Sequence, residues 1–390
     1  MFHKIVIEQL RGDSLEKLEE LFGCYDLPVK RVFRGRKMLM CETMDKGLYG
    51  ITATKASVHR LEREYLVKDY LNRQGFTALD QLCRNREGSF ITEDKYHTSY
   101  VVKHFFVGKE LSIDSLEEVE EGAYNLALLH NKAEGMLLWL KEEEERIKKQ
   151  LRQKIEEEQE ETARQVMEQK FSRIHYFETE DGIKEQEGVN AYEWMKQRFL
   201  KKNRELKRIG EYMKKNGNKG SFGEQYNRYS SMFIKEGQKA FLELEQRMKD
   251  QQELKRLKYG FCHGNYQHHN VLKTEEGWAT IGMEQFHFAP QILDLYDYLR
   301  KVLEKNHYTP SYAHAIISGY GRVICLTKTD CETLFLLLQY PEKFWKISNH
   351  YYNSKKTWVP PKTVEKLSKV VEQDQEKARF LVKFREDFVD

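Results

Sequence analysis

The segment Phe261–Leu272, which reads FCHGNYQHHNVL, decides how this chain is expected to fold. A turn of small and polar residues, His263–Asn265, separates two short apolar runs, and after the turn Glu275–Gly277 comes a further apolar run, Trp278–Ile281. Short apolar runs divided by Gly and Asn predict strands with tight connections. The same segment holds three histidines and three amide side chains, which is more typical of a functional site than of a core.

Composition indicates a globular protein with an unusually charged surface. The 390 residues are enough for two or three lobes. Hydrophobic residues are 40% and aromatic residues 12% of the chain, which excludes a disordered protein. Charged residues reach 33%, above the ~25% usual in globular domains. Because 65 Lys and Arg nearly balance 62 Asp and Glu, the net charge of +3 gives no basic field for nucleic acid.

Cysteine spacing points to a reducing compartment, and hydropathy points to a chain that does not enter a membrane. The six cysteines include no CxxC pair, which argues against a zinc knuckle and against a disulfide framework. Charged residues interrupt the first 30 positions, and no stretch approaches the ~18 apolar residues of a membrane span. We therefore expect a soluble protein that is made in the cytoplasm, without membrane insertion.

The first hundred residues predict a small α+β lobe. Asp45–Gly47 and the turn around Gly35 divide β-rich runs, and Ser57 is placed to cap a helix that ends before Gly75. The region 2–7 is expected to be a short strand or a docking arm. Further strands are expected at 29–33, 37–42, 47–54, 89–92 and 98–106, and helices at 14–22 and 57–72.

The middle of the chain predicts long helices. Asp114 is expected to cap a helix at 116–130. From Lys141 to Glu161, fifteen of 21 residues are charged, which predicts a long, largely exposed helix. The apolar spacing fades after Ile155, so a coiled coil is not established. The charged faces are either solvated or a docking surface for a partner. Helices are also expected at 191–213 and 226–257.

The last third predicts a helical region. Helices are expected at 291–304, 312–320 and 330–339, from Pro341 onwards, and as one last helix at 363–386. Aromatic residues recur in this part and are expected to belong to the core: Phe344, Trp345, Tyr351, Tyr352 and Trp358.

The segment quoted first, with the strand after it, resembles the catalytic and metal loops of aminoglycoside phosphotransferases and choline kinase-like enzymes. In that family the order is His-Gly-Asp, four residues, Asn and two apolar residues, then a turn and Ile-Asp-Phe/Trp-Asp/Glu. The resemblance implies a bilobal protein-kinase-like α+β fold. A small antiparallel-sheet lobe with one main helix would cover residues 1–107. A large mainly helical lobe would cover 108–390, with a charged helical insertion at 141–222 and the two loops at 261–284.

Three charged positions of the family pattern carry uncharged residues here, two in these loops and one in the small lobe. His263, Gly264 and Asn270 match, but the catalytic base position is Asn265, which cannot accept a proton at neutral pH. The metal-binding aspartate position is Gly282, which has no ligand atom. Glu284 matches the last acidic residue of the second motif, and the resemblance gives Asp294 the role of bracing the loop.

The small lobe also departs from the family, in the part that binds phosphate in family members. Thr52 occupies the place of the lysine that pairs with phosphate, and Lys55 lies three residues on, which turns it to the opposite face of a strand. Glu62 or Glu64 would be the lysine's partner on the following helix. Gly35 is the only glycine of the first turn, so no glycine-rich loop is expected to hold phosphate.

These losses favour a catalytically inactive pseudokinase, with no functional catalytic residue, no cofactor and no metal. The alternative is a divergent phosphotransferase that uses ATP and Mg²⁺, with Asn270 and Glu284 as a reduced metal site. A third hypothesis is a nucleotide- or sugar-binding module without transfer. Zinc binding by His263, His268, His269 and His287 is not favoured, because adjacent histidines point in different directions and no acidic or cysteine ligand is regularly spaced from them.

The amino-acid sequence of the last third resembles the CotS family of endospore coat-associated proteins. Tyr340–Ile347 (YPEKFWKI) and Asn349–Ser354 (NHYYNS) carry this resemblance, together with the Cys-His-Gly form of the loop. It covers about residues 25–385, apart from the helical stretch near 141–222. It implies a protein made in the mother cell and deposited in the spore coat, with other coat proteins as partners and a structural or assembly role.

Overall fold

The computed structural model describes residues 6–7, 21–36, 38–45, 47–172, 174, 191–216, 220–247, 257–353 and 361–390. These residues belong to two compact units. The first is Met1–Leu111, Leu128–Glu185 and His263–His287, and the second is Ser112–Ala127, Gln186–Cys262 and Phe288–Asp390. None of the described helices has an apolar stretch long enough to cross a membrane.

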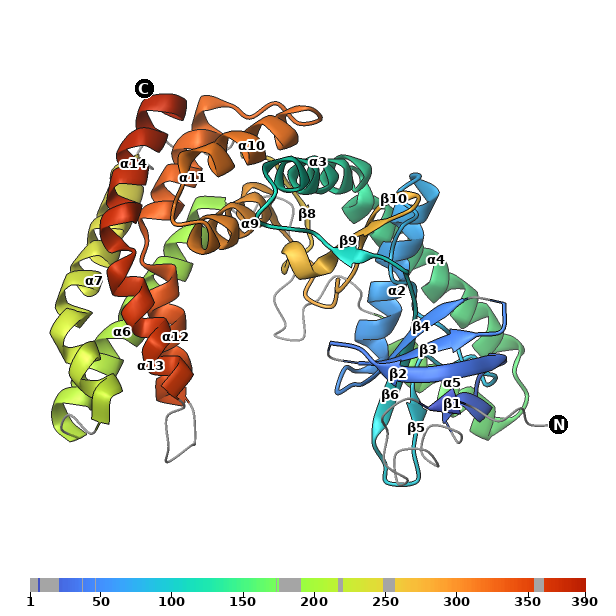
Figure 1. Ribbon diagram of the computed structural model, residues 1–390. Coiled ribbons are helices and arrows are strands. Elements are labelled where there is room, and N and C mark those ends of the chain that lie inside the picture. The colour runs from blue at the N-terminus through green and yellow to red at the C-terminus, as the bar shows by residue number, and fades with distance from the viewer. Residues whose placement is uncertain are drawn as a thin grey trace. The chain divides into compact units, whose positions relative to one another are not determined.

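A six-stranded sheet with one helix beside it forms the centre of the first unit (Figure 1). Its strands occur in the order β1-β2-β3-β4-β6-β5, and all neighbouring strands are antiparallel except β1 and β2. The bounds are β1 Val6–Ile7, β2 Val29–Arg34, β3 Leu39–Thr43, β4 Leu48–Ala53, β5 Thr92–Glu93 and β6 Ser99–Phe105. The closing hairpin is confirmed, although β5 keeps only the end of the strand expected at 89–92.

Helix α2 (Val58–Arg73) follows β4 as the sequence predicts. The Ser57 hydroxyl accepts the amide hydrogen of Arg60 at 3.3 Å, so the expected N-cap is confirmed. Gly75, just past the helix, has φ +83°, a conformation that favours glycine. Leu61 packs with Val101 of β6, which fixes the helix against one face of the sheet.

A second, three-stranded sheet of the first unit carries the two loops of interest. It has the order β10-β9-β7, with β7 Lys109–Glu110, β9 Val271–Thr274 and β10 Gly277–Thr280. The expected strands on both sides of the turn Glu275–Gly277 are confirmed. Lys109 and Glu110 form β7 by pairing with β9.

The charged middle is mainly helical where it is described, but the single long helix expected at 141–161 is interrupted at 158–160. It forms α4 (Met136–Glu157) and α5 (Glu161–Ser172) in the first unit, and α6 (Ala191–Asn216) in the second. Most of the helix expected at 14–22 lies outside the described residues. Helix α3 (Leu116–Lys132) has a different cap from the expected one, because the hydroxyl of Ser115, and not Asp114, accepts the amide hydrogen of Glu118.

The second unit is mainly helical. Figure 1 shows α6 and α7 (Gly220–Arg247) side by side, and α13 packs against α7. The remaining elements are the strands β8 (Tyr259–Cys262) and β11 (His287–Pro290) and the helices α9 (Ile292–Lys305), α10 (Pro310–Gly321), α11 (Lys328–Gln339), α12 (Glu342–Asn353), α13 (Pro361–Glu372) and α14 (Asp374–Phe388). β11 begins with His287, which is counted with the first unit. The prediction of one last helix at 363–386 is therefore wrong, because the chain forms two helices that meet at Gln373.

The aromatic residues of the last third are core residues, as expected. Phe344 is fully buried in a cluster with Phe233 and Tyr226 of α7, and Trp345, Tyr351 and Tyr352 pack against that cluster. Phe233 stacks on Phe344 with 4.3 Å between ring centroids. Trp358 lies outside the described residues.

Candidate functional site

The loop between β8 and β9 is held in one conformation by its own side chains. His263 is fully buried, and its Nδ1 accepts the amide hydrogen of Asn265 at 3.2 Å. Its Nε2 therefore carries the ring hydrogen and donates it to the carbonyl of Ile281 at 3.0 Å. Asn270 Nδ2 donates to the carbonyl of Asn265 at 2.9 Å, which closes the loop on itself. The matched residues His263 and Asn270 thus act as a frame around position 265.

Gly264 is required by the shape of this loop. Its φ is +76°, which L side chains rarely adopt. A Cβ built at this position would lie 2.0 Å from the carbonyl oxygen of Gln285, in the loop that follows β10. The two loops can approach this closely only because residue 264 has no side chain.

The second loop places Gly282 against Asn270. A Cβ on Gly282 would lie 3.1 Å from Asn270 Cγ, and the φ of Gly282 is +77°. The Ile281 amide donates to the Asn270 carbonyl at 2.9 Å, so the two loops are directly joined. The Gly282 amide donates to Asp80 Oδ2 at 3.1 Å. A carboxylate therefore lies beside the position where the family's metal-binding aspartate is missing, but another segment supplies it.

Asp80 comes from an irregular segment that runs between the two sheets of the first unit. Leu79 forms an isolated parallel bridge to Thr280 at the end of β10, and Leu82 forms an antiparallel bridge to Lys103 of β6. These two bridges fix Asp80 between the second loop and the six-stranded sheet.

Lys103 is the centre of a buried charge cluster. Its Nζ lies 2.8 Å from Glu64 Oε1, 3.5 Å from Asp80 Oδ2 and 2.5 Å from Glu284 Oε1. Lys68, one turn after Glu64 on α2, lies 2.5 Å from Glu64 Oε1 and 2.8 Å from Asp80 Oδ1. We call these five residues the lysine cluster. Its two ammonium groups and three carboxylates carry a formal charge of −1.

Electrostatics keeps three members of the lysine cluster ionised. Burial by itself raises the pKa of Glu64 and of Asp80, but Lys68 and Lys103 more than offset it and leave both pKa values below normal. Burial lowers the pKa of Lys103, but the charges of Asp80, Glu64 and Glu284 raise it well above its ordinary value. Glu64, Asp80 and Lys103 are therefore charged at neutral pH.

The structure decides between the two glutamates proposed on α2. Glu64 is 2% exposed and pairs with both lysines, whereas Glu62 is only partly buried. Thr52 lies near the end of β4 and its hydroxyl donates to the Ala53 carbonyl, at 3.4 Å. Lys55 is exposed beyond the end of that strand.

Sequence reasoning missed Lys103, Lys68 and Asp80. Lys103 lies in the sequence Tyr100–Phe105 (YVVKHF), where a single charge interrupts an apolar strand. That interruption was the available signal, because a lysine inside a buried strand needs an anionic partner.

The histidines do not converge on a metal site. His263 uses both ring nitrogens in hydrogen bonds, one with Asn265 and one with Ile281 of the second loop. His269 Nδ1 lies 2.6 Å from Glu110 Oε2, and His287 Nδ1 donates to the carbonyl of Gln285 at 3.1 Å. Among the described residues, no group of three potential metal ligands includes His263, His268, His269 or His287.

Arg36 ties the hairpin between β2 and β3 to this region. Its Nη1 donates to the carboxylate of Glu110 at 2.6 and 2.7 Å, next to the contact between Glu110 and His269. Burial raises the pKa of Glu110, but its hydrogen bonds to Arg36 and His269 more than offset this and leave the pKa below normal. The turn where a glycine-rich loop is absent thus carries an arginine that is already paired with a carboxylate.

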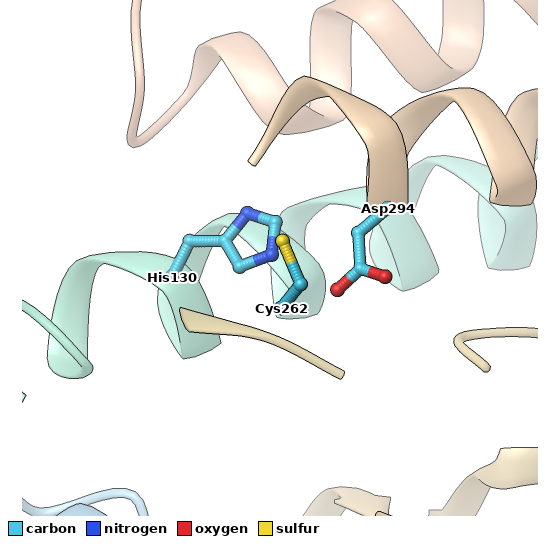
Figure 2. Close-up of side chains that lie close together, drawn as sticks. All are labelled: His130, Cys262 and Asp294. Atoms are coloured by element: carbon cyan, nitrogen blue, oxygen red, sulfur yellow. The ribbon is translucent and has the colours of Figure 1, made fainter. Parts of the chain in front are cut away.

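Asp294 belongs to the second unit, in the first turn of α9, where it is 3% exposed. Figure 2 shows it beside Cys262, the last residue of β8, and the carboxylate and the thiol sulfur lie within 4.8 Å. Burial, with a further contribution from Asp294, raises the pKa of the Cys262 thiol well above normal. The role of Asp294 as a brace for the loop stays a prediction.

Comparison with solved structures places this fold among kinase-like proteins. An aminoglycoside phosphotransferase from Alicyclobacillus acidocaldarius has a TM-score of 0.67 at 15% identity, over 98% of this chain and 97% of that chain. Spectinomycin phosphotransferase gives 0.57 at 12% identity, over 95% and 100%. Amicoumacin kinase gives 0.53 at 11% identity, over 94% of each chain. The predicted kinase-like α+β fold is thereby confirmed.

Comparison by sequence adds nothing to this. No family model matches the chain, and no curated protein matches it.

Proposed function

We propose that this chain is a kinase-like protein that does not transfer phosphoryl groups. The observation that carries the proposal is the geometry around Asn265. His263 and Asn270 hold the loop by hydrogen bonds to the backbone of residue 265, and the side chain placed there is a neutral amide. The frame of a catalytic loop is present without a group that takes the proton of an acceptor hydroxyl.

The second loop supports the same conclusion. Gly282 supplies no ligand, and the nearby oxygens of Asp80 and Glu284 already pair with Lys103. Two ammonium groups in the cluster would repel a divalent cation. The arrangement therefore does not fit Mg²⁺. A catalytic base contributes about 10²- to 10⁴-fold in rate, and metal ions neutralise the charge that develops on a transferred phosphoryl group.

The test restores the missing charges. Phosphate release from ATP with Mg²⁺ is measured for the wild type and for the double variant Asn265→Asp/Gly282→Asp. We expect the wild type at background and the double variant above it. Thermal unfolding checks that the double variant is folded, because the new Cβ at 282 would lie close to Asn270. A wild-type rate above that of a folded double variant would contradict the proposal.

A divergent phosphotransferase is the second candidate. The pair Lys103–Glu64 favours it, because a buried lysine and a helical glutamate are present although Thr52 stands at the expected position. The solved structures point the same way: spectinomycin phosphotransferase was captured with ADP and spectinomycin, and amicoumacin kinase with AMP-PNP, Ca²⁺ and Ami. This candidate requires ATP and Mg²⁺, with Glu284 released from Lys103 to join Asn270 as a ligand.

The biological role proposed for the non-catalytic protein is assembly of the bacterial endospore coat. It rests on the resemblance of Tyr340–Ile347 and Asn349–Ser354 to coat-associated proteins. Synthesis in the mother-cell cytoplasm, deposition in the coat and binding to other coat proteins follow from it. The test is a fluorescent fusion in a sporulating host, where we expect a signal that moves to the forespore surface. A signal that stays diffuse throughout sporulation would overturn this role.

A further inference from the structure

The lysine cluster contains one carboxylate that differs from the others in exposure. The side chains of Lys68, Lys103, Glu64 and Asp80 are at most 5% exposed, whereas that of Glu284 is 52% exposed. The four buried groups are two ammonium ions and two carboxylates, so they balance without Glu284. The fifth group is therefore an additional anion on the solvent side of Lys103.

The ammonium group of Lys103 can reach the position that the ammonium group of a lysine at residue 52 would occupy. β4 pairs with β6 so that Thr52 is opposite Val101 and Gly50 is opposite Lys103. Side chains of residues two apart share a face of the strand, so Lys103 and Thr52 lie on the same face in a diagonal relation. Diagonal neighbours are about 7–8 Å apart, which a lysine side chain can span.

A second cation lies beside the Glu284 backbone. Arg60, in the first turn of α2, donates from Nη2 to the carbonyl of Glu284 at 2.7 Å. An anion at the position of the Glu284 carboxylate therefore meets the ammonium of Lys103, and the guanidinium of Arg60 is bound to the backbone of the same residue. Phosphate oxygens are strong acceptors for both groups.

We propose that Lys103 is the phosphate-binding cation of this protein, relocated from β4 to β6, and that the Glu284 carboxylate occupies the phosphate position until a ligand displaces it. The ligand is a polyphosphate group, which a nucleotide or free pyrophosphate can supply. The step is an exchange of one anion for another at Lys103, with no bond made or broken. It goes beyond the proposed function, since it concerns binding and holds whether or not transfer occurs.

The experiment is a calorimetric titration of the full chain with ADP, with pyrophosphate and with adenosine. We expect ADP and pyrophosphate to bind and adenosine to bind more weakly than ADP. Lys103→Met should weaken both phosphate ligands by about 10- to 100-fold, the loss of one or two charge-assisted hydrogen bonds. Glu284→Gln should strengthen both, because the competing anion is gone.

Lys55→Met is the control, since Lys55 is also close to position 52 in the sequence but is exposed beyond the end of β4 and outside the lysine cluster. It should leave both affinities within about threefold of the wild type, under 1 kcal/mol. If Lys103→Met fails to fold, the exposed residue 284 still decides the question. Any of three results would overturn the proposal. These are equal affinities in Lys103→Met and wild type, an unchanged or weaker affinity in Glu284→Gln, and no phosphate binding to any folded variant.

A transfer-competent wild type would disprove the proposed function and leave this inference standing, because affinity and turnover are separate readouts.

Discussion

At the scale of single residues, the loop that carries Asn265 depends on backbone positions that accept no side chain. Gly264→Ala would combine a positive φ with a Cβ 2.0 Å from the Gln285 carbonyl oxygen. We expect a loss of a few kcal/mol in unfolding free energy, of the order that strain and overpacking cost together. Urea denaturation measures it.

Gly88→Ala is the matched control for this prediction. Its φ is +78°, but a Cβ added there would meet no atom within 4 Å. Only the conformational cost, about 1 kcal/mol, should then appear. Equal losses in the two variants would mean that the close approach of the two loops contributes nothing.

A buried carboxyl in the second unit predicts a specific pH dependence. Burial raises the pKa of Glu236 to about 7, although Lys377 lowers it in part. The folded state therefore binds this proton more tightly than the unfolded state, whose Glu pKa is about 4.3. The stabilisation from this proton is fully present below about pH 4, and it is lost as pH rises from there through about 7.

Glu236→Gln should remove this dependence. We expect the variant to be more stable than the wild type at pH 8 by about 1–3 kcal/mol, and close to it at about pH 4. Denaturant unfolding at the two pH values measures the difference. A variant that loses stability at pH 8 would show that the Glu236 charge is favourable in the folded protein.

At the scale of helices and strands, local patterns predicted α2 well because its signals are local. Ser57 caps it, Gly75 follows it, and its apolar spacing faces the sheet. Ser57→Ala should cost about 0.5–2 kcal/mol. Thermal unfolding tests this, with the exposed Ser112, which precedes α3 without capping it, changed to alanine as a control. An unchanged melting temperature for Ser57→Ala would mean that the cap does not stabilise α2.

The division between α13 and α14 could not be predicted, because no Pro or Gly marks it. Gln373 at the junction is 5% exposed, and its side chain donates to the carbonyl of Glu304 on α9 at 3.3 Å. α13 packs on α7 and α12, while α14 packs on α11 and α10. Different packing partners, far away in sequence, fix where one helix ends and the next begins.

The lysine cluster shows the same limit for the site. The sequence locates Asn265, Asn270 and Gly282 because their motif is continuous along the chain. Lys103 and Asp80 become neighbours only through the pairing of β6 with residues 81–83 and of residue 79 with β10. No short stretch of sequence encodes strand register across such distances. The sequence therefore shows that position 52 lacks a lysine, but it does not show that Lys103 could take that role.

At the scale of the whole molecule, the chain has a kinase-like fold, while positions 52, 265 and 282 carry uncharged residues. The charged middle and the last third are mainly helical where the chain is described, although the helices expected at 141–161 and 363–386 are each divided in two. The lobe boundaries at 107 and 108 stay predictions, since the described residues pack into units that each use several chain segments. A fold this widely shared fixes where a reaction could occur and not whether it does.

The absence of phosphoryl transfer is tested by magnesium-dependent release of phosphate from ATP, compared between wild type and Asn270→Ala. We expect no release above background in either protein, because position 265 has no base and position 282 has no metal ligand. A wild-type rate that disappears in a folded Asn270→Ala variant would contradict it.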